Sequence, residues 1–143
     1  KYASLVSKKG FEALDTIPET AKAWMAPLPM DYDSTLSGYV NMVKMMGGHG
    51  GSNMPKAQAS KDATMAYFIL KNIKPATIFI HFNGAYHSEN YDGINWYLKR
   101  NKPELTIGTI TTISQKDIKK LLEENMGKAD YIICVDEDMT GTY

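Results

Sequence analysis

Hydrophobic residues gather in three short, nearly continuous runs, at 76–82, 105–113 and 131–135. Each run is rich in β-branched or aromatic residues, a composition typical of β-strands. The runs lack regular polar alternation, as strands covered on both faces do. The sequence therefore predicts three buried strands.

Apolar residues recur at helical spacing between and before these runs. The longest such pattern predicts a helix over 53–73 that packs on the sheet, with Ala59, Ala63, Ala66, Ile69, Leu70 and Ile73 on its inner face. Shorter helices are predicted at 34–46, 91–99 and 115–126. The last begins at a capping-box-like segment and ends near a glycine.

Strands that alternate with helices through short connections are expected to lie parallel, with right-handed crossovers. The predicted fold class is α/β: half of a doubly wound parallel sheet with a small helical subdomain. Residues 1–23 and 53–143 form the α/β body, and residues 24–52 form the helical excursion. Because three parallel strands leave an edge unpaired, we expect a missing N-terminal half or a homo-oligomer. The start at Lys1, without an initiator Met, also suggests a truncated chain.

Composition narrows the possible partners. Sixteen basic residues balance sixteen acidic ones, and a neutral chain lacks the basic surface that nucleic acids require. No apolar run reaches the roughly 20 residues of a membrane span.

Cys134 lies in the run 131–135 and is expected to be a small buried hydrophobe. Nine methionines, six of them between Met25 and Met54, indicate either a pliable binding surface or a loosely packed helical core.

Candidate chemistry centres on Gly84-Ala-Tyr-His87. Ligands of parallel sheets bind beyond the carboxyl ends of strands, so His87 is expected at a binding edge, after a tight turn at Gly84. Its imidazole would suit a metal, a haem or proton transfer, and Ser88 or Glu89 would orient it. The alternative is a histidine that caps a helix or meets solvent.

The other two histidines differ in context. His81 lies inside a predicted strand and is expected to be a satisfied core residue, whereas His49 stands in an accessible glycine-rich loop. Asp136, Glu137 and Asp138 follow the last strand; they form either a solvated acidic tail or part of a metal site with His87. The sequence contains no P-loop, dinucleotide fingerprint, HExxH or GxSxG signature.

Four segments in order resemble the ChaN-like haem-binding lipoproteins of the Tiki and TraB superfamily. They are 1–14 (KYASLVSKKGFEAL), 25–28 (MAPL), 57–66 (AQASKDATMA) and 84–87 (GAYH). The resemblance implies a doubly wound α/β body, haem or iron binding at a bacterial outer membrane or in the periplasm, and a dimer that sandwiches haem. It also implies a lipid anchor outside this sequence as the only membrane attachment.

Of the family's two GxxH motifs, only the C-terminal one has a counterpart here, with Gly84 and His87 at its fixed positions. The segment from Gly47 to Gly50 does not replace the N-terminal motif, because its sequence context is different. Family members bind haem iron through tyrosine; the sequence does not place that ligand on Tyr2, Tyr39, Tyr67 or Tyr86, and the alternative is a tyrosine in the missing N-terminal half. The predicted haem-binding residues are Gly84, Tyr86, His87, His49 and Met46, with Met42 beside them.

We therefore expect a non-catalytic haem-binding domain that serves iron uptake or storage. Two alternatives stay open. Tiki relatives are metal-dependent peptidases, so His87 could ligate a divalent metal in a hydrolase, with a glutamate outside this sequence activating water. The Met-rich helix could instead belong to a protein-interaction domain without chemistry.

Overall fold

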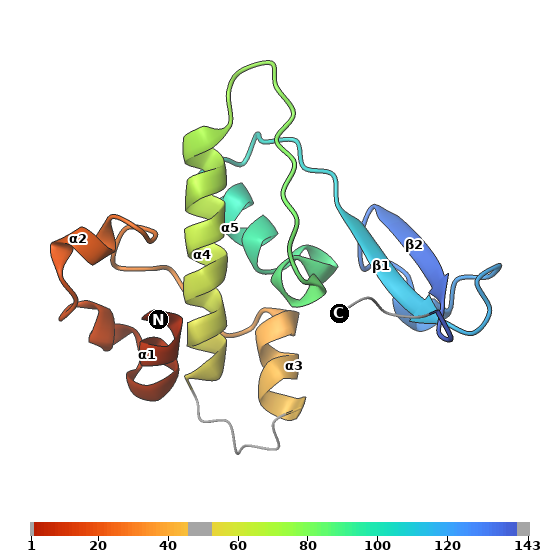
Figure 1. Cartoon of the computed structure of the whole chain (residues 1–143), viewed down its shortest axis with the longest axis horizontal. Coiled ribbons are helices and arrows are strands. Elements are labelled where there is room, and N and C mark those ends of the chain that lie inside the picture. The colour runs from red at the N-terminus through yellow and green to blue at the C-terminus, as the bar shows by residue number, and fades with distance from the viewer. Residues whose placement is uncertain (1, 46–52, 140–143) are drawn as a thin grey trace.

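The computed structural model describes residues 2–45 and 53–139. Its longest element is α4 (Met54–Asn72), around which the other helices are arranged (Figure 1). Pro55 lies in the first turn of α4, where its missing N–H breaks no helical hydrogen bond. The helix ends at Asn72, shortly before Lys74, where the following Pro75 disfavours helical backbone. The predicted helix over 53–73 is confirmed.

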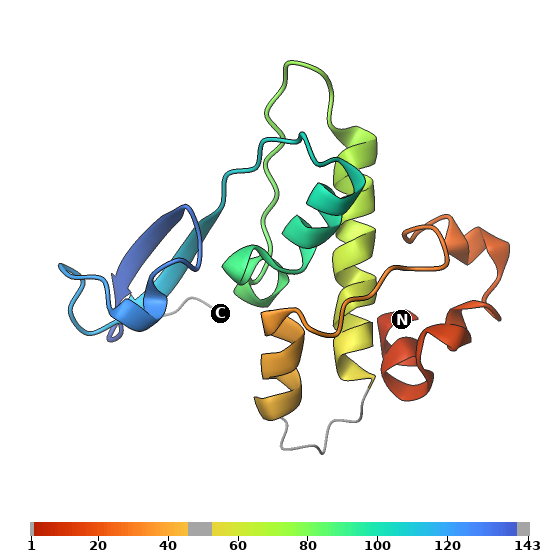
Figure 2. The same ribbon diagram turned by 180° about the vertical axis from the view of Figure 1, so that it is seen from behind.

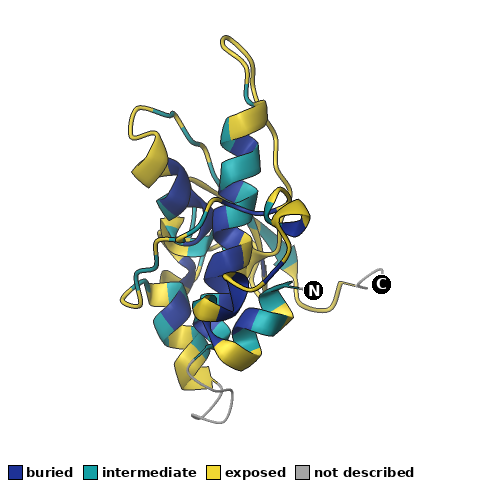
Figure 3. Cartoon of the chain, turned by 90° about the vertical axis from the view of Figure 1, so that its left-hand side faces the viewer, coloured by how far each residue is buried: buried dark blue, intermediate teal, exposed yellow. Residues whose placement is uncertain are grey.

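Helices, not a sheet, cover α4. On one side lie α1 (Tyr2–Lys9), the 3-10 turn η1 (Phe11–Leu14) and α2 (Glu19–Lys22); on the other lies α5 (Ile94–Asn101), and α3 (Ser37–Met45) packs near the start of α4. The short side chains of Ala57, Ala63 and Ala66 let these neighbours approach closely, and Figure 3 shows buried residues along much of α4. The expectation that α4 packs on a sheet is therefore wrong.

Two apolar clusters form the core. One joins α1, η1 and α2 to the start of α4 through Val6, Leu14, Ile17, Ala21, Met25 and Ala57. The other joins α4 to α5 through Ala26, Ala63, Ala66, Ile69, Ile94, Tyr97 and Leu98. The predicted helices at 34–46 and 91–99 correspond to α3 and α5. The division into 1–23 with 53–143 and a separate unit at 24–52 stays a prediction.

Strands β1 (Ile110–Gln115) and β2 (Tyr131–Asp136) form a parallel pair, from Ile110 opposite Tyr131 to Gln115 opposite Asp136. The pair stands beside the helices (Figures 1 and 2). Hydrogen bonds near residue 90 link it to the 3-10 turn η3 (Glu89–Tyr91): the amide of Asn90 donates to the carbonyl of Lys128 at 3.0 Å. The fold is thus a mixture of helices and a parallel sheet, broadly α/β, as predicted.

The predicted strand 76–82 is absent from the sheet. Its side chains face solvent, with Ile78 91% and Phe82 90% exposed, and the backbone groups of 78–82 make no hydrogen bonds within the described residues. A strand exists only if a neighbour satisfies its backbone groups, and within the described residues β1 pairs with β2 alone. His81 is consequently exposed rather than a core residue, and Cys134 is half-buried.

Two further predictions are corrected by side-chain hydrogen bonds. The strand predicted at 105–113 begins only at Ile110, because Lys99 Nζ donates to the carbonyls of Pro103 and Leu105 and ties this stretch to the end of α5. The helix predicted at 115–126 is an irregular loop with one 3-10 turn, η4 (Glu123–Asn125). Buried Gln115 bonds to the carbonyls of Asp117 and Lys120, and such side-chain bonds compete with a helix.

Candidate functional site

His87 closes a short 3-10 turn, η2 (Ala85–His87), in which its amide donates to the carbonyl of Gly84 at 2.9 Å. The turn lies against α4. The expectation that His87 follows the carboxyl end of a buried strand is wrong, because the predicted strand 76–82 does not form. The ring is mostly covered, with 21% of its side chain exposed. A helix therefore positions the histidine that the sequence singled out.

The ring meets a buried carboxylate. Asp62, in the middle of α4, is fully buried, and its Oδ1 lies 2.5 Å from His87 Nδ1. Tyr39 of α3 donates its hydroxyl to Asp62 Oδ2 at 2.8 Å. The side-chain amide of Gln58, one turn before Asp62, lies 2.8 Å from the same Nδ1. Two side chains of α4 thus meet one imidazole nitrogen, and Tyr39 of α3 reaches the same carboxylate from its other oxygen.

Burial sets the electrostatics of this cluster. Desolvation raises the pKa of the Asp62 carboxyl, and the hydrogen bonds from His87 and Tyr39 oppose that rise in part. The pKa of the Tyr39 phenol is raised strongly, first by burial and then by the charge of Asp62. Tyr39 therefore keeps its proton and serves Asp62 as a hydrogen-bond donor.

Gly93 closes the back of the cluster. Its backbone has φ +54° and ψ −118°, a conformation open to glycine and strained for other residues. A Cβ there would lie 2.4 Å from the carbonyl oxygen of His87 and 3.1 Å from Asp62 Oδ2. Asn95, buried in α5, donates to the carbonyl of Ser88 at 2.9 Å and holds the same turn.

The other predicted site residues take varied positions. Tyr86 is 61% exposed, and its hydroxyl donates to Met45 Sδ at the end of α3, at 3.7 Å. Gly84 has φ −69°, and a Cβ there would meet nothing within 4 Å, so the conformational reason given for this glycine is wrong. Met46 and His49 lie outside the described residues, and their part in the site stays a prediction.

Neither Ser88 nor Glu89 orients His87, contrary to expectation, because each contacts another residue. Ser88 Oγ accepts a hydrogen bond from Asn83 at 2.9 Å, and Glu89 lies 3.9 Å from Lys128 Nζ. In the part of the chain that the structure describes, no three His, Cys, Asp or Glu side chains gather as a metal site would require. A metal site of His87 with Asp136–Asp138 therefore does not form.

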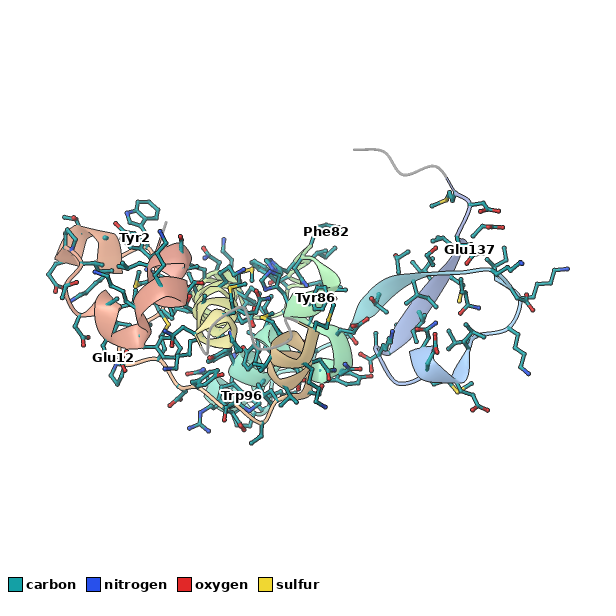
Figure 4. All side chains as sticks on the ribbon, turned by 90° about the horizontal axis from the view of Figure 1, so that it is seen from below. Tyr2, Glu12, Phe82, Tyr86, Trp96 and Glu137 are labelled. Atoms are coloured by element: carbon teal, nitrogen blue, oxygen red, sulfur yellow. The ribbon has the colours of Figure 1, made fainter. Side chains whose placement is uncertain are left out.

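Two hollows lie near the cluster without including His87. The smaller, about 290 Å³, lies between α1 and α4 and is lined in part by Gln58. The larger, about 690 Å³, is lined by α5 and the chain after it, including Trp96. Figure 4 shows Phe82 and Tyr86 on one side of the helices and Trp96 on the other. His87 lines neither hollow.

The sequence analysis missed Asp62, Gln58 and Gly93, and it named Tyr39 without its role as a hydrogen-bond donor to Asp62. A signal for Asp62 was present: it lies three residues after Ala59 and four before Ala66, so the apolar face of the predicted helix carries one carboxylate. Such a residue is rarely buried without a partner. Tyr39 and Gly93 carried no comparable signal, because their roles depend on how distant elements pack.

Comparison with known families agrees with the resemblance. Residues 1–98 match the family described as "Haem-binding uptake, Tiki superfamily, ChaN". The match covers more than half of the chain, which therefore belongs to this family. It includes α1 to α4 and the His87 cluster and ends within α5, before the parallel strands. No curated protein and no solved structure matches the chain.

The residues beside His87 have the chemistry of a haem site. Imidazole, phenol and thioether are the side-chain groups that His, Tyr and Met offer to haem iron; here His87, Tyr86 and Met45 supply one of each. Phe82, 90% exposed, adds apolar surface.

In the described residues, no helix is long and apolar enough to cross a membrane.

Proposed function

We propose that this chain binds haem, in uptake or storage of iron and without catalysis, and that His87 provides an axial ligand to the iron. The observation that carries the proposal is the contact of His87 Nδ1 with the buried carboxylate of Asp62. Ligating histidines almost always bond through their other ring nitrogen to a carboxylate, carbonyl or water. Nδ1 is engaged in this way, and within the described residues the hydrogen-bonding group nearest to Nε2 is the Gln58 amide, at 3.5 Å.

We further propose that the porphyrin lies on the open surface beside the η2 turn. Tyr86 and Met45 touch each other there, and Phe82 lies four residues before Tyr86 in the sequence and on the same side of the helices in Figure 4. Burial of a flat apolar ligand against such side chains supplies most of its affinity. Tyr86 is our candidate for the family's tyrosine ligand, because Tyr39 is buried and bonded to Asp62. Met46 and His49, next along the chain, would extend this surface.

A haem titration with matched histidine variants tests the proposal. The wild type is expected to produce a Soret band with saturable binding. His87→Ala should weaken binding or shift the Soret maximum, whereas His81→Ala, in the exposed segment, should bind like the wild type. If His87→Ala retains both the affinity and the Soret maximum of the wild type, His87 is not a ligand.

Nothing among the described residues favours the peptidase alternative; bound divalent metal together with peptide turnover would support it.

We propose that a second copy of the chain covers the segment 77–82. Its six residues carry no Lys, Arg, Asp or Glu, so two copies can pair without opposing like charges. The backbone groups of 78–82 make no hydrogen bonds within the described residues, and together with the apolar side chains they suit β-pairing across a two-fold axis. Covering its four large apolar side chains would bury on the order of 1,000 Å² in total, near the lower limit for a specific interface.

Light scattering tests this assembly. The wild type is expected to have twice the chain mass of 16.0 kDa, and Ile80→Lys, within the segment, should shift it to the monomer. Ile118→Lys, on an exposed loop elsewhere, is the control and should leave the dimer intact. A wild type that stays monomeric at high concentration contradicts the proposal.

Two finer features are also proposals. We place the protein in the bacterial envelope as a lipoprotein, as the family resemblance implies, and cell fractionation with acyl-chain labelling of the full reading frame tests this. We also propose that β1 and β2 belong to a larger doubly wound sheet, because Ile110, Tyr131 and Ile133 are exposed on one face of the pair. A full-length structure in which this face stays bare contradicts it.

A further inference from the structure

Asp62 is a costly residue to bury where it stands. It is fully buried on the alanine-rich face of α4, and an unpaired carboxylate in such a place would cost several kcal/mol. Its one close basic partner among the described residues is His87, at 2.5 Å. Exposed Lys61, its neighbour on α4, adds only a weaker charge interaction. The carboxylate is therefore committed to the histidine and to the Tyr39 hydroxyl.

Hydrogen-bond chemistry decides which ring nitrogen carries the proton. An ionised carboxylate only accepts hydrogen bonds, and a neutral imidazole has one N–H and one lone pair. Tyr39 already donates to the second oxygen, Oδ2, and so stabilises the ionised form. The proton between Asp62 and His87 then belongs to Nδ1, and the lone pair of the ring lies on Nε2.

The surroundings fix the ring as well as the proton. Gly93 leaves no room for a side chain between its backbone and the His87 carbonyl, and the bond from Asn95 to Ser88 anchors the following residue. On the other side, the amide group of Gln58 lies 2.8 Å from Nδ1; because Nδ1–H donates to Asp62, Gln58 can share this hydrogen only by turning its amide oxygen to the ring. The ring is therefore held at the edge that carries Nδ1.

We propose that Asp62 is the positioning residue of this site: it holds His87 as the Nδ1–H tautomer and thereby presents the Nε2 lone pair to the ligand. The choice of haem iron as that ligand rests on the proposed function. Asp62 itself does not touch the ligand. The selection of the tautomer is a property of the protein without haem and can be measured in its absence.

The direct test is ¹⁵N–¹H NMR of the haem-free protein labelled at histidine. At a pH well above about 6.5, where a free imidazole is neutral, wild-type His87 should show the Nδ1–H pattern, with its signals assigned by their loss in His87→Gln. A wild-type His87 in the Nε2–H form overturns the proposal, and this reading needs no variant of Asp62.

Variants then connect the tautomer to binding. Asp62→Asn should lose the preference for Nδ1–H and weaken haem binding by about 10- to 100-fold, as loss of such outer partners does. Asp31→Asn, which removes an exposed carboxylate paired with Arg100, is the matched control and should change neither. Tyr39→Phe keeps the carboxylate and should retain the tautomer, which covers the case in which Asp62→Asn does not fold.

The possible failures are distinguishable. If Asp62→Asn changes the tautomer but binds haem like the wild type, Asp62 does not position the ligand and the proposal fails. If the wild type shows the Nδ1–H form and binds no haem, the proposed function fails, while the tautomer selection by Asp62 is supported.

Discussion

Gly93 offers the sharpest structural test of the His87 cluster. Substitution by alanine has two separate costs. The first is backbone strain: at φ +54° and ψ −118° a residue with a Cβ costs on the order of 1–3 kcal/mol. The second is steric, because the new Cβ would lie 2.4 Å from the carbonyl oxygen of His87, and a backbone atom cannot move aside without shifting the η2 turn. We expect Gly93→Ala to lower stability and to weaken haem binding together.

Gly127→Ala is the control, since Gly127 also has a positive φ, +77°, but a Cβ there would meet nothing within 4 Å. Gly127→Ala should lower stability through backbone strain alone. For a chain of this size, such strain lowers the midpoint of thermal unfolding by a few degrees, about 2–4 °C per kcal/mol. Thermal unfolding and haem titration of both variants measure the difference. If Gly93→Ala matches Gly127→Ala in both assays, Gly93 does not support the site and the packing argument is refuted.

Three further predictions concern single residues. Gly84→Ala should leave stability and haem binding within error of the wild type, because its backbone is extended and the added methyl meets nothing; a loss of binding in titration would show a contact that the free protein lacks. Gln115→Ala should cost about 1–3 kcal/mol in chemical denaturation, since it leaves buried groups of the 116–125 loop unpaired, whereas exposed Thr112→Ala should cost much less; equal costs would contradict this. Hydrogen bonds from Thr109 lower the pKa of Asp130, so its contribution to stability is present above the unfolded value of about 3.9 and is lost as the pH falls through the lower folded value; the Thr109 amide shift should therefore titrate below about 3.9, and a midpoint at or above it would be inconsistent.

The sequence predicted elements best where local pattern and long-range packing agree. The alanine and isoleucine spacing of 53–73 predicted α4 because the same face that is apolar in sequence is covered by α1 and α5 in space. The runs that became β1 and β2 were recognised as strands by their composition, and their parallel pairing followed from the length of the connection. The prediction that both faces of these strands are buried is wrong, because Ile110, Tyr131 and Ile133 are exposed. His87 was identified from its motif, although the reason given for its position was wrong.

The failures arise where distant groups decide the outcome. The apolar run 76–82 has the composition of a buried strand, but no sequence pattern states whether a neighbour will pair with it. The apolar spacing of Ile118, Leu122 and Met126 predicted a helix, and the buried amide of Gln115 holds their backbone in a loop instead. Asp62 was overlooked because its partner lies 25 positions along the chain, beyond any local pattern.

Detection of a histidine nitrogen on the haem iron tests the central claim most directly. In the ferric haem complex of the protein labelled with ¹⁵N-histidine, pulsed electron paramagnetic resonance should detect coupling between the iron and one protein imidazole. The coupling should be absent from His87→Ala and unchanged in His81→Ala. A complex without any histidine coupling, or one whose coupling survives in His87→Ala, would contradict the assignment of His87 as the axial ligand.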